Sequence, residues 1–152
     1  MIKSNIEEIV KTEGEFIVTP VGVSMWPLIR NRRDTVRVVK YTGNLKKYDL
    51  PVYKRDTGKL IMHRCIGIKN DSYIMCGDNQ TYKEYGIKDR HIIGIVQGIY
   101  RDEKYIPVTN KLYRFYVRFW CINLKLRGAI LRILRLSKSY KKVYQQLLEE
   151  NR

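Results

Sequence analysis

The sequence predicts a mainly β domain with a short helix at its N-terminus and a basic amphipathic helix at its C-terminus. Between residues 15 and 100, at least five short apolar runs alternate with turn residues, which is typical of a compact β fold. From residue 112 onward, apolar side chains recur at helical spacing instead. The hydrophobic fraction of 44% is ordinary for a globular protein, so 152 residues can form one real core.

The first hundred residues predict one helix and a series of strands. Ser4 followed by Glu7 fits a capping box and predicts a helix over residues 4–11. Pro51 indicates that its strand lies at a sheet edge or contains a bulge. Asn70-Asp71 predicts a turn that joins two strands in a hairpin. The predicted strands cover residues 16–18, 35–39, 50–53, 59–69, 72–76 and 91–100.

Positive charge is concentrated toward the C-terminus. The net charge is +15, and residues 101–152 contain 13 Lys/Arg and 4 Asp/Glu, so they contribute +9. This asymmetry indicates a globular domain over residues 1–110 and a basic helical appendage over residues 111–152. The appendage should meet an anionic partner, either a membrane surface or nucleic acid.

Residues 112–136 predict a helix with two different sides. Its basic side chains gather in a stripe about 40° wide at 100° per residue, and most of the remaining surface is aromatic or aliphatic. Such a helix would lie in the interface of an anionic membrane. Six charges within residues 112–136 argue against a membrane span. Alternatively, the apolar side packs on the β domain and the charges are solvated. The stripe consists of Arg114, Arg118, Lys125 and Arg132.

The sequence also bears on compartment and cofactors. Residues 1–15 lack the apolar core of a signal peptide, so we expect a cytoplasmic protein, peripheral on the inner membrane face if the helix binds lipid. Cys65, Cys76 and Cys121 lack metal-like spacing, and free thiols are expected. No metal and no cofactor are predicted.

The hairpin predicts a pairing between an imidazole and a carboxylate. If the turn is centred after Asn70, cross-strand partners have numbers that add to 141. Cys65 then faces Cys76, and His63 faces Asp78, all on one side of the hairpin. A carboxylate beside an imidazole fixes its tautomer, as a general base requires. The plainer alternatives are a structural histidine, an aspartate that caps a turn, and cysteines that pack in the core or form a disulfide.

Four segments in order resemble the type I signal peptidase clan of serine proteases. They are Gly22-Val23-Ser24-Met25-Trp26-Pro27, Asp34-Thr35-Val36, His63-Arg64-Cys65-Ile66-Gly67 and Gly77-Asp78-Asn79. In this clan the third segment carries the general base, and a histidine there, as His63 is here, is typical of the endoplasmic-reticulum, archaeal and sporulation-type branch. The resemblance covers roughly residues 14–100 and implies a signal-peptidase-like β domain with serine endopeptidase activity.

The resemblance also implies roles for individual residues. Ser24 would attack a peptide carbonyl, His63 would accept its proton, and Asp78 would support the base. The histidine branch has a further essential aspartate about six residues on, where this sequence has Glu84 or, further along, Asp89. The acidic member is therefore open among these three residues. The backbone N–H of Ser24 would stabilise the oxyanion.

This sequence also departs from the family. Arg33 stands where the family has a glycine before Asp34. We expect no N-terminal membrane anchor, because no uncharged run approaches the roughly 20 residues that span a bilayer. A cytosolic member should cut a different substrate, such as the leader of a small peptide precursor. Two other classes remain: a basic β domain that binds nucleic acid, favoured by the charge and the 12 tyrosines, and a pseudo-enzyme that binds peptides by strand addition.

Overall fold

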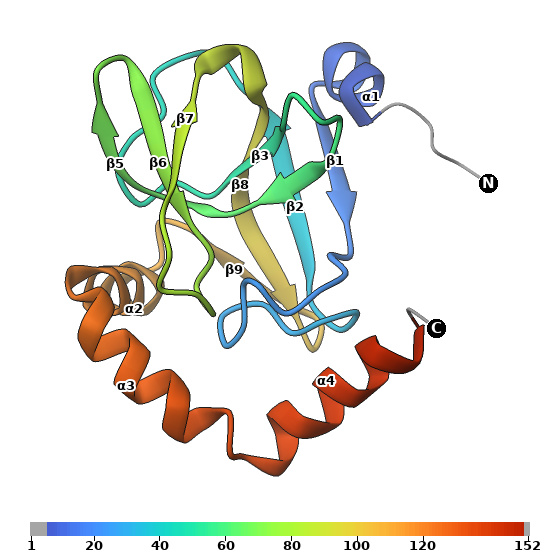
Figure 1. Cartoon of the computed structure of the whole chain (residues 1–152). Helices are drawn as coiled ribbons and strands as arrows, with labels where there is room; N and C mark the ends of the chain where they lie inside the picture. The colour runs from blue at the N-terminus through green and yellow to red at the C-terminus, as the bar shows by residue number, and fades with distance from the viewer. Residues whose placement is uncertain (1–5, 151–152) are drawn as a thin grey trace.

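The computed structural model describes residues 6–150, which form an antiparallel β domain with helices at both ends (Figure 1). The elements are α1 (Ile6–Glu13), β1 (Glu15–Val18), β2 (Thr35–Lys40), β3 (Pro51–Lys54), β4 (Leu60–Met62), β5 (Arg64–Lys69), β6 (Ser72–Cys76), β7 (Glu84–Ile87), a 3-10 turn η1 (Asp89–His91), β8 (Ile92–Arg101), β9 (Lys104–Pro107), α2 (Lys111–Ile122), α3 (Leu124–Leu134) and α4 (Lys138–Glu150).

The strands form two antiparallel sheets. The larger sheet has the order β1-β2-β8-β3-β4, with β9 also paired to β8, and the smaller sheet has the order β5-β6-β7. Asn70 and Asp71 have φ values of 48° and 53°, so a tight left-handed turn joins β5 to β6 as the sequence predicts.

The fold contains 32% helix and 32% strand, so it is mixed and only loosely mainly β. The sequence predicts the strand-rich region but misses β7 and β9. The strand predicted over residues 59–69 is wrong as a single element, because the chain leaves β4 at His63 and enters β5 in the other sheet. Residues 59–69 have strand-forming character throughout, so local propensity does not mark the break. The two strands differ in their partners, because β4 pairs with β3 and β5 pairs with β6.

The predictions for the end of α1 and for the start of β3 are each confirmed only in part. Gly14, at φ 77°, ends α1, while Ser4 of the predicted capping box lies outside the described residues. Pro51 begins β3, which lies between β8 and β4, so the edge position is wrong. The bulge is present, because the pairing of β3 with β8 shifts between Val52 and Tyr53.

The main core lies between the larger sheet and α2. Val36 and Val96 of the sheet pack with Val117 of α2 and with Met25 from the loop after β1. One side of α2 therefore packs on the β domain, as one of the two interpretations of the helix expected. Leu112, Phe115, Phe119 and Ile122 of the same helix remain exposed.

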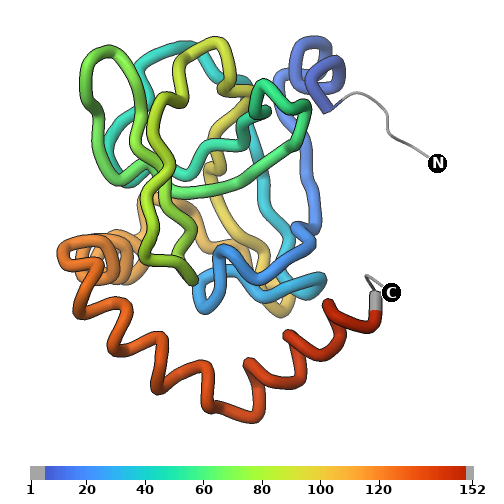
Figure 2. The backbone as a smooth tube through the Cα atoms, in the orientation of Figure 1, coloured from blue at the N-terminus to red at the C-terminus, as the bar shows by residue number. Residues whose placement is uncertain are grey.

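The helix predicted over residues 112–136 is two helices. The chain breaks at Asn123, whose side chain accepts hydrogen bonds from the backbone N–H groups of Lys125 and Leu126 and so caps α3. From there α3 and α4 pass along one side of the molecule, beside the loop between β1 and β2 (Figure 2). Within residues 6–150, no helix combines the length and apolarity that a bilayer span requires.

Candidate active site

Ser24 lies in the long loop between β1 and β2. Met25 and Ile29 of this loop are buried in the main core, and they hold the loop against the sheet. Gly22 has a φ of 122°, a conformation that favours glycine, and its N–H donates to Asn31 Oδ1 at 2.7 Å. The loop around Ser24 is thus fixed from within by packing and by a hydrogen bond.

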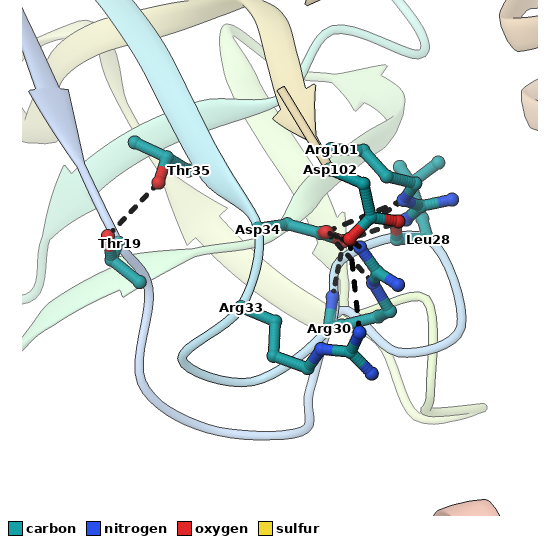
Figure 3. A network of polar contacts seen from close by, with 8 residues as sticks. All are labelled: Thr19, Leu28, Arg30, Arg33, Asp34, Thr35, Arg101 and Asp102. Carbon is teal, nitrogen blue, oxygen red and sulfur yellow. Dashed lines mark hydrogen bonds and ion pairs between the residues drawn. The ribbon is translucent and has the colours of Figure 1, made fainter. Parts of the chain in front are cut away.

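A buried carboxylate holds the end of this loop in place, just before β2 begins (Figure 3). Asp34, which is fully buried, accepts hydrogen bonds from the backbone N–H and the guanidinium of Arg30 and from Arg101 at the end of β8. Burial raises the pKa of Asp34, but hydrogen bonds from Arg101 and Arg30 outweigh burial and hold the pKa below its usual value. Arg101 also donates to the Leu28 carbonyl. Asp34 therefore positions the loop.

The segment Gly77-Asp78-Asn79 lies directly against the backbone of Ser24. The Asn79 N–H donates to the Ser24 carbonyl at 2.8 Å. A Cβ atom on Gly77 would lie 2.6 Å from the same carbonyl oxygen, so only glycine allows this approach. Two of the four segments in the resemblance therefore meet in space.

The predicted pairing of His63 with Asp78 is wrong. Near the turn the pairs add to 141, as in Gly67 with Ile74, but the register shifts between Cys65 and Gly67. Beyond this bulge Cys65 faces Met75, so the predicted facing of Cys65 and Cys76 is also wrong. Cys65, Cys76 and Cys121 are free thiols.

Asp78 pairs with Arg64 instead of His63. The two side chains are fully buried and form a bidentate ion pair, with Arg64 Nε and one terminal nitrogen donating at 3.0 and 2.9 Å. Arg64 also donates to the carbonyl of Tyr48. Asp78 therefore joins the start of β5 to the Gly77–Asn79 segment and contributes to the position of both.

Glu84 is the acidic residue beside His63. Its Oε2 lies 3.9 Å from His63 Nδ1. Arg55 donates two hydrogen bonds to Glu84, at 2.6 and 2.7 Å, and the Tyr53 hydroxyl donates a third to Oε2 at 2.7 Å. The third candidate, Asp89, accepts hydrogen bonds from the hydroxyls of Tyr41 and Tyr73, and it makes no contact with His63 within the described chain.

Tyr53 links the histidine to this carboxylate. Its hydroxyl oxygen lies 3.4 Å from His63 Nδ1, and its only proton is donated to Glu84. The oxygen can then only accept from the histidine, which assigns the proton of neutral His63 to Nδ1. Nε2 keeps its lone pair and is the nitrogen available to act as a base.

The protonation states suit a base. Burial lowers the pKa of His63 to about 4, although Glu84 raises it, so His63 is neutral at pH 7. Burial raises the pKa of Glu84, but hydrogen bonds from Arg55 and Tyr53 outweigh burial, and the pKa lies below its usual value. The site thus contains a neutral imidazole and an ionised carboxylate.

Ser24 and His63 line one pocket of about 290 Å³. Its walls combine apolar side chains with polar and charged ones. The apolar side chains include Ile29, Leu60 and Met62, and the polar and charged ones include Arg55, Lys59 and Gln80. Among the described residues, no hydrogen bond joins Ser24 to His63, and none occupies the Ser24 N–H. Catalytic hydrogen bonds are often long before substrate binds, so this arrangement is compatible with a nucleophile, a base and a free oxyanion donor.

Sequence reasoning missed Tyr53 and Arg55. Tyr53 is in β3 and Arg55 follows the last residue of that strand, and both bind Glu84 on β7, which the sequence did not predict. A polar pair at this spacing beside apolar strand residues was the only available signal. Residues 6–150 contain no cluster of three metal-ligating His, Cys, Asp or Glu side chains.

Comparison with known proteins gives no match to a family model, to a curated protein or to a solved structure.

Proposed function

We propose that this protein is a serine endopeptidase of the signal-peptidase type, with Ser24 as the nucleophile and His63 as the general base. The observation that carries the proposal is the shared pocket of Ser24 and His63, in which Tyr53 and Glu84 leave His63 Nε2 as the free base. The order of four sequence segments supports the same class. Glu84 takes the supporting role for which Asp78 and Asp89 were the other candidates.

The proposed reaction follows the usual course of acyl transfer. Ser24 Oγ attacks the peptide carbonyl carbon while His63 Nε2 takes the hydroxyl proton. The Ser24 N–H stabilises the oxyanion, and the negative charge of Glu84 stabilises the imidazolium. His63 then donates its proton to the leaving amine as the C–N bond breaks. A water molecule, activated by His63, hydrolyses the acyl-serine ester and restores both residues.

The proposed substrate is an extended peptide, such as a leader or a signal-like segment. The pocket is lined by Leu60, Ile61 and Met62 of β4, which ends the larger sheet. An edge strand has free backbone groups, and an extended peptide can pair with them. This feature favours a flexible peptide over a folded protein.

The test replaces Ser24 and His63 with alanine in separate variants of the full chain. We expect each variant to lose at least about a thousandfold in cleavage of a proteome-derived peptide library, measured by mass spectrometry. Ser72→Ala, at the start of β6, is the matched control and should cleave as the wild type does. Undiminished cleavage by either variant would refute the assigned pair. Binding of peptides without any cleavage by the wild type would favour the pseudo-enzyme instead.

We also propose that α2 binds the surface of an anionic membrane, on the inner face in a cytoplasmic protein. Leu112, Phe115, Phe119 and Ile122 are 50–79% exposed, and at 100° per residue they share an arc of about 80°. The basic side chains of Arg118 and Arg114 lie on one side of this arc, about 40° and 80° beyond Ile122. Phe115 and Phe119 could also stack on bases, but the exposed aliphatic side chains of Leu112 and Ile122 on the same arc suit lipid better than nucleic acid.

Vesicle sedimentation tests this partner. We expect the full chain to bind vesicles that contain phosphatidylserine, and the double variant Phe115→Ser/Phe119→Ser to lose at least about tenfold in binding. Ile68→Ser, at an exposed apolar residue of β5, should bind as the wild type does. Equal binding by the double variant, or stronger salt-sensitive binding to nucleic acid than to vesicles, would overturn the membrane proposal.

A further inference from the structure

The two C-terminal helices are anchored to the segments that surround Ser24. The Tyr140 ring of α4 packs edge-on against Trp26, with ring centroids 4.9 Å apart, and its hydroxyl accepts from Asn79 Nδ2 at 3.3 Å. Arg135, just before α4, donates to the side-chain oxygen of Asn79 at 3.1 Å and to its carbonyl at 2.5 Å. Asn79 in turn holds the Ser24 carbonyl. The position of α4 is therefore coupled to the candidate active site.

This anchoring creates a second pocket at Ser24. The pocket has a volume of about 460 Å³, and one wall is formed by Tyr144, Leu147 and Leu148 of α4. The opposite wall comes from the Ser24 loop and the Asn79 segment. Three of its residues also line the first pocket: Gly22, Ser24 and Gln80. Ser24 therefore lies where the two pockets join.

The second pocket is apolar on its α4 side. Tyr144 and Leu148 remain 45% and 46% exposed although they face the domain. Among the side chains that the structure describes, no charged one lines this pocket, and Lys141 and Lys142 of the same helix are exposed outside it. Incompletely buried apolar side chains that face a reactive serine have room for the side chains of a bound peptide.

We propose that α4 is a substrate-recognition element, and that Tyr144, Leu147 and Leu148 select apolar side chains on one side of the scissile bond. The inference rests on the proposed peptidase function. A peptide whose carbonyl lies at Ser24 must continue into both pockets, because Ser24 is at their junction. Side chains of an extended peptide alternate in direction, so α4 should contact every second residue on its side of the cut.

The experiment compares cleavage profiles of full-length variants on a proteome-derived peptide library. We expect the wild type to prefer apolar residues at alternate positions on one side of the cut. In Leu148→Lys this preference should shift toward Asp and Glu, and cleavage of the preferred apolar peptides should fall about tenfold. Gln146→Lys adds the same charge to the opposite side of α4 and should leave the profile unchanged.

The outcomes separate this inference from the function on which it rests. Leu148 is half exposed, so its replacement should not prevent folding, and an unchanged thermal transition would verify this. Cleavage that depends on Ser24 but has the same profile in Leu148→Lys and the wild type would overturn the role of α4 alone. Absence of Ser24-dependent cleavage in the wild type would overturn the peptidase function together with this inference.

Discussion

Replacing Tyr53 with phenylalanine removes one oxygen atom from the candidate site. The hydroxyl donates to Glu84 at 2.7 Å and lies 3.4 Å from His63 Nδ1. Without it, Nδ1 keeps only the carboxylate at 3.9 Å, which is too far for a direct hydrogen bond. Glu84 itself stays in place, because two hydrogen bonds from Arg55 remain. The variant therefore isolates the link between imidazole and carboxylate.

The expected effect follows from what the link does. A hydrogen bond to a neutral partner contributes about 0.5–1.5 kcal/mol, and a bond to a charged group about 1.5–3 kcal/mol. Loss of about 1.4–2.7 kcal/mol of transition-state stabilisation corresponds to a decrease of about 10- to 100-fold in kcat/KM. The proton of His63 would no longer be fixed on Nδ1, so the decrease should fall mainly on kcat.

The assay is the pH profile of kcat/KM for a peptide identified from the library. In the wild type, kcat/KM should rise with an apparent pKa of about 4, as His63 becomes neutral, and stay level near pH 7. Tyr53→Phe should lower this plateau. Tyr41→Phe, which removes a hydroxyl bound to Asp89, is the matched control. A plateau within twofold of the wild type, or an equal decrease in Tyr41→Phe, would refute the proposed link.

Three further predictions test the acidic partner, the acid stability and the loop contact. Glu84→Gln should lower kcat at least about tenfold and Asp89→Asn should not, which steady-state kinetics would measure; the reverse order would assign the partner to Asp89. His63 binds a proton below pH 6.5 in the unfolded chain but only below about 4 in the folded one. As the pH falls from 6.5 to 4, this residue should therefore lower the free energy of unfolding by about 3 kcal/mol. Urea unfolding should find this loss in the wild type and not in His63→Gln. Gly77→Ala should lower both the thermal transition and kcat, because a Cβ would lie 2.6 Å from the Ser24 carbonyl; unchanged values would show that the contact is not required.

Local sequence signals predict the hairpin and fail on its register. Asn70 and Asp71 mark the turn because both residues tolerate positive φ, and pairing near the turn follows directly. One extra residue in β5 then shifts the register of every pair farther from the turn. The residue type at that position does not predict a bulge. The predicted partnership of His63 with Asp78 failed because of this shift and because both residues lie outside the paired strands β5 and β6.

Local sequence patterns also fail to predict the break between α2 and α3 and the contact between Tyr53 and Glu84. Asn123 is a favourable capping residue, but the apolar pattern continues through it, so the periodicity predicts one helix where two exist. Tyr53 and Glu84 are 31 positions apart, and they meet because the sheet that contains β3 packs against the sheet that contains β7. The order of the four segments predicts Ser24 and His63 as a pair, and both line one pocket. The contacts of His63 with Tyr53 and Glu84 depend instead on tertiary structure.

The two-sheet construction has a consequence for the chain while it folds. Ser24 belongs to a loop of the larger sheet, His63 stands at the crossing between the sheets, and Glu84 begins β7 of the smaller one. Contacts so distant in sequence form only after long loops have closed. The proposed catalytic residues come together only once both sheets have docked. A nascent or partly unfolded chain would therefore lack the proposed active site, and it could not cleave its own unfolded neighbours by the proposed reaction.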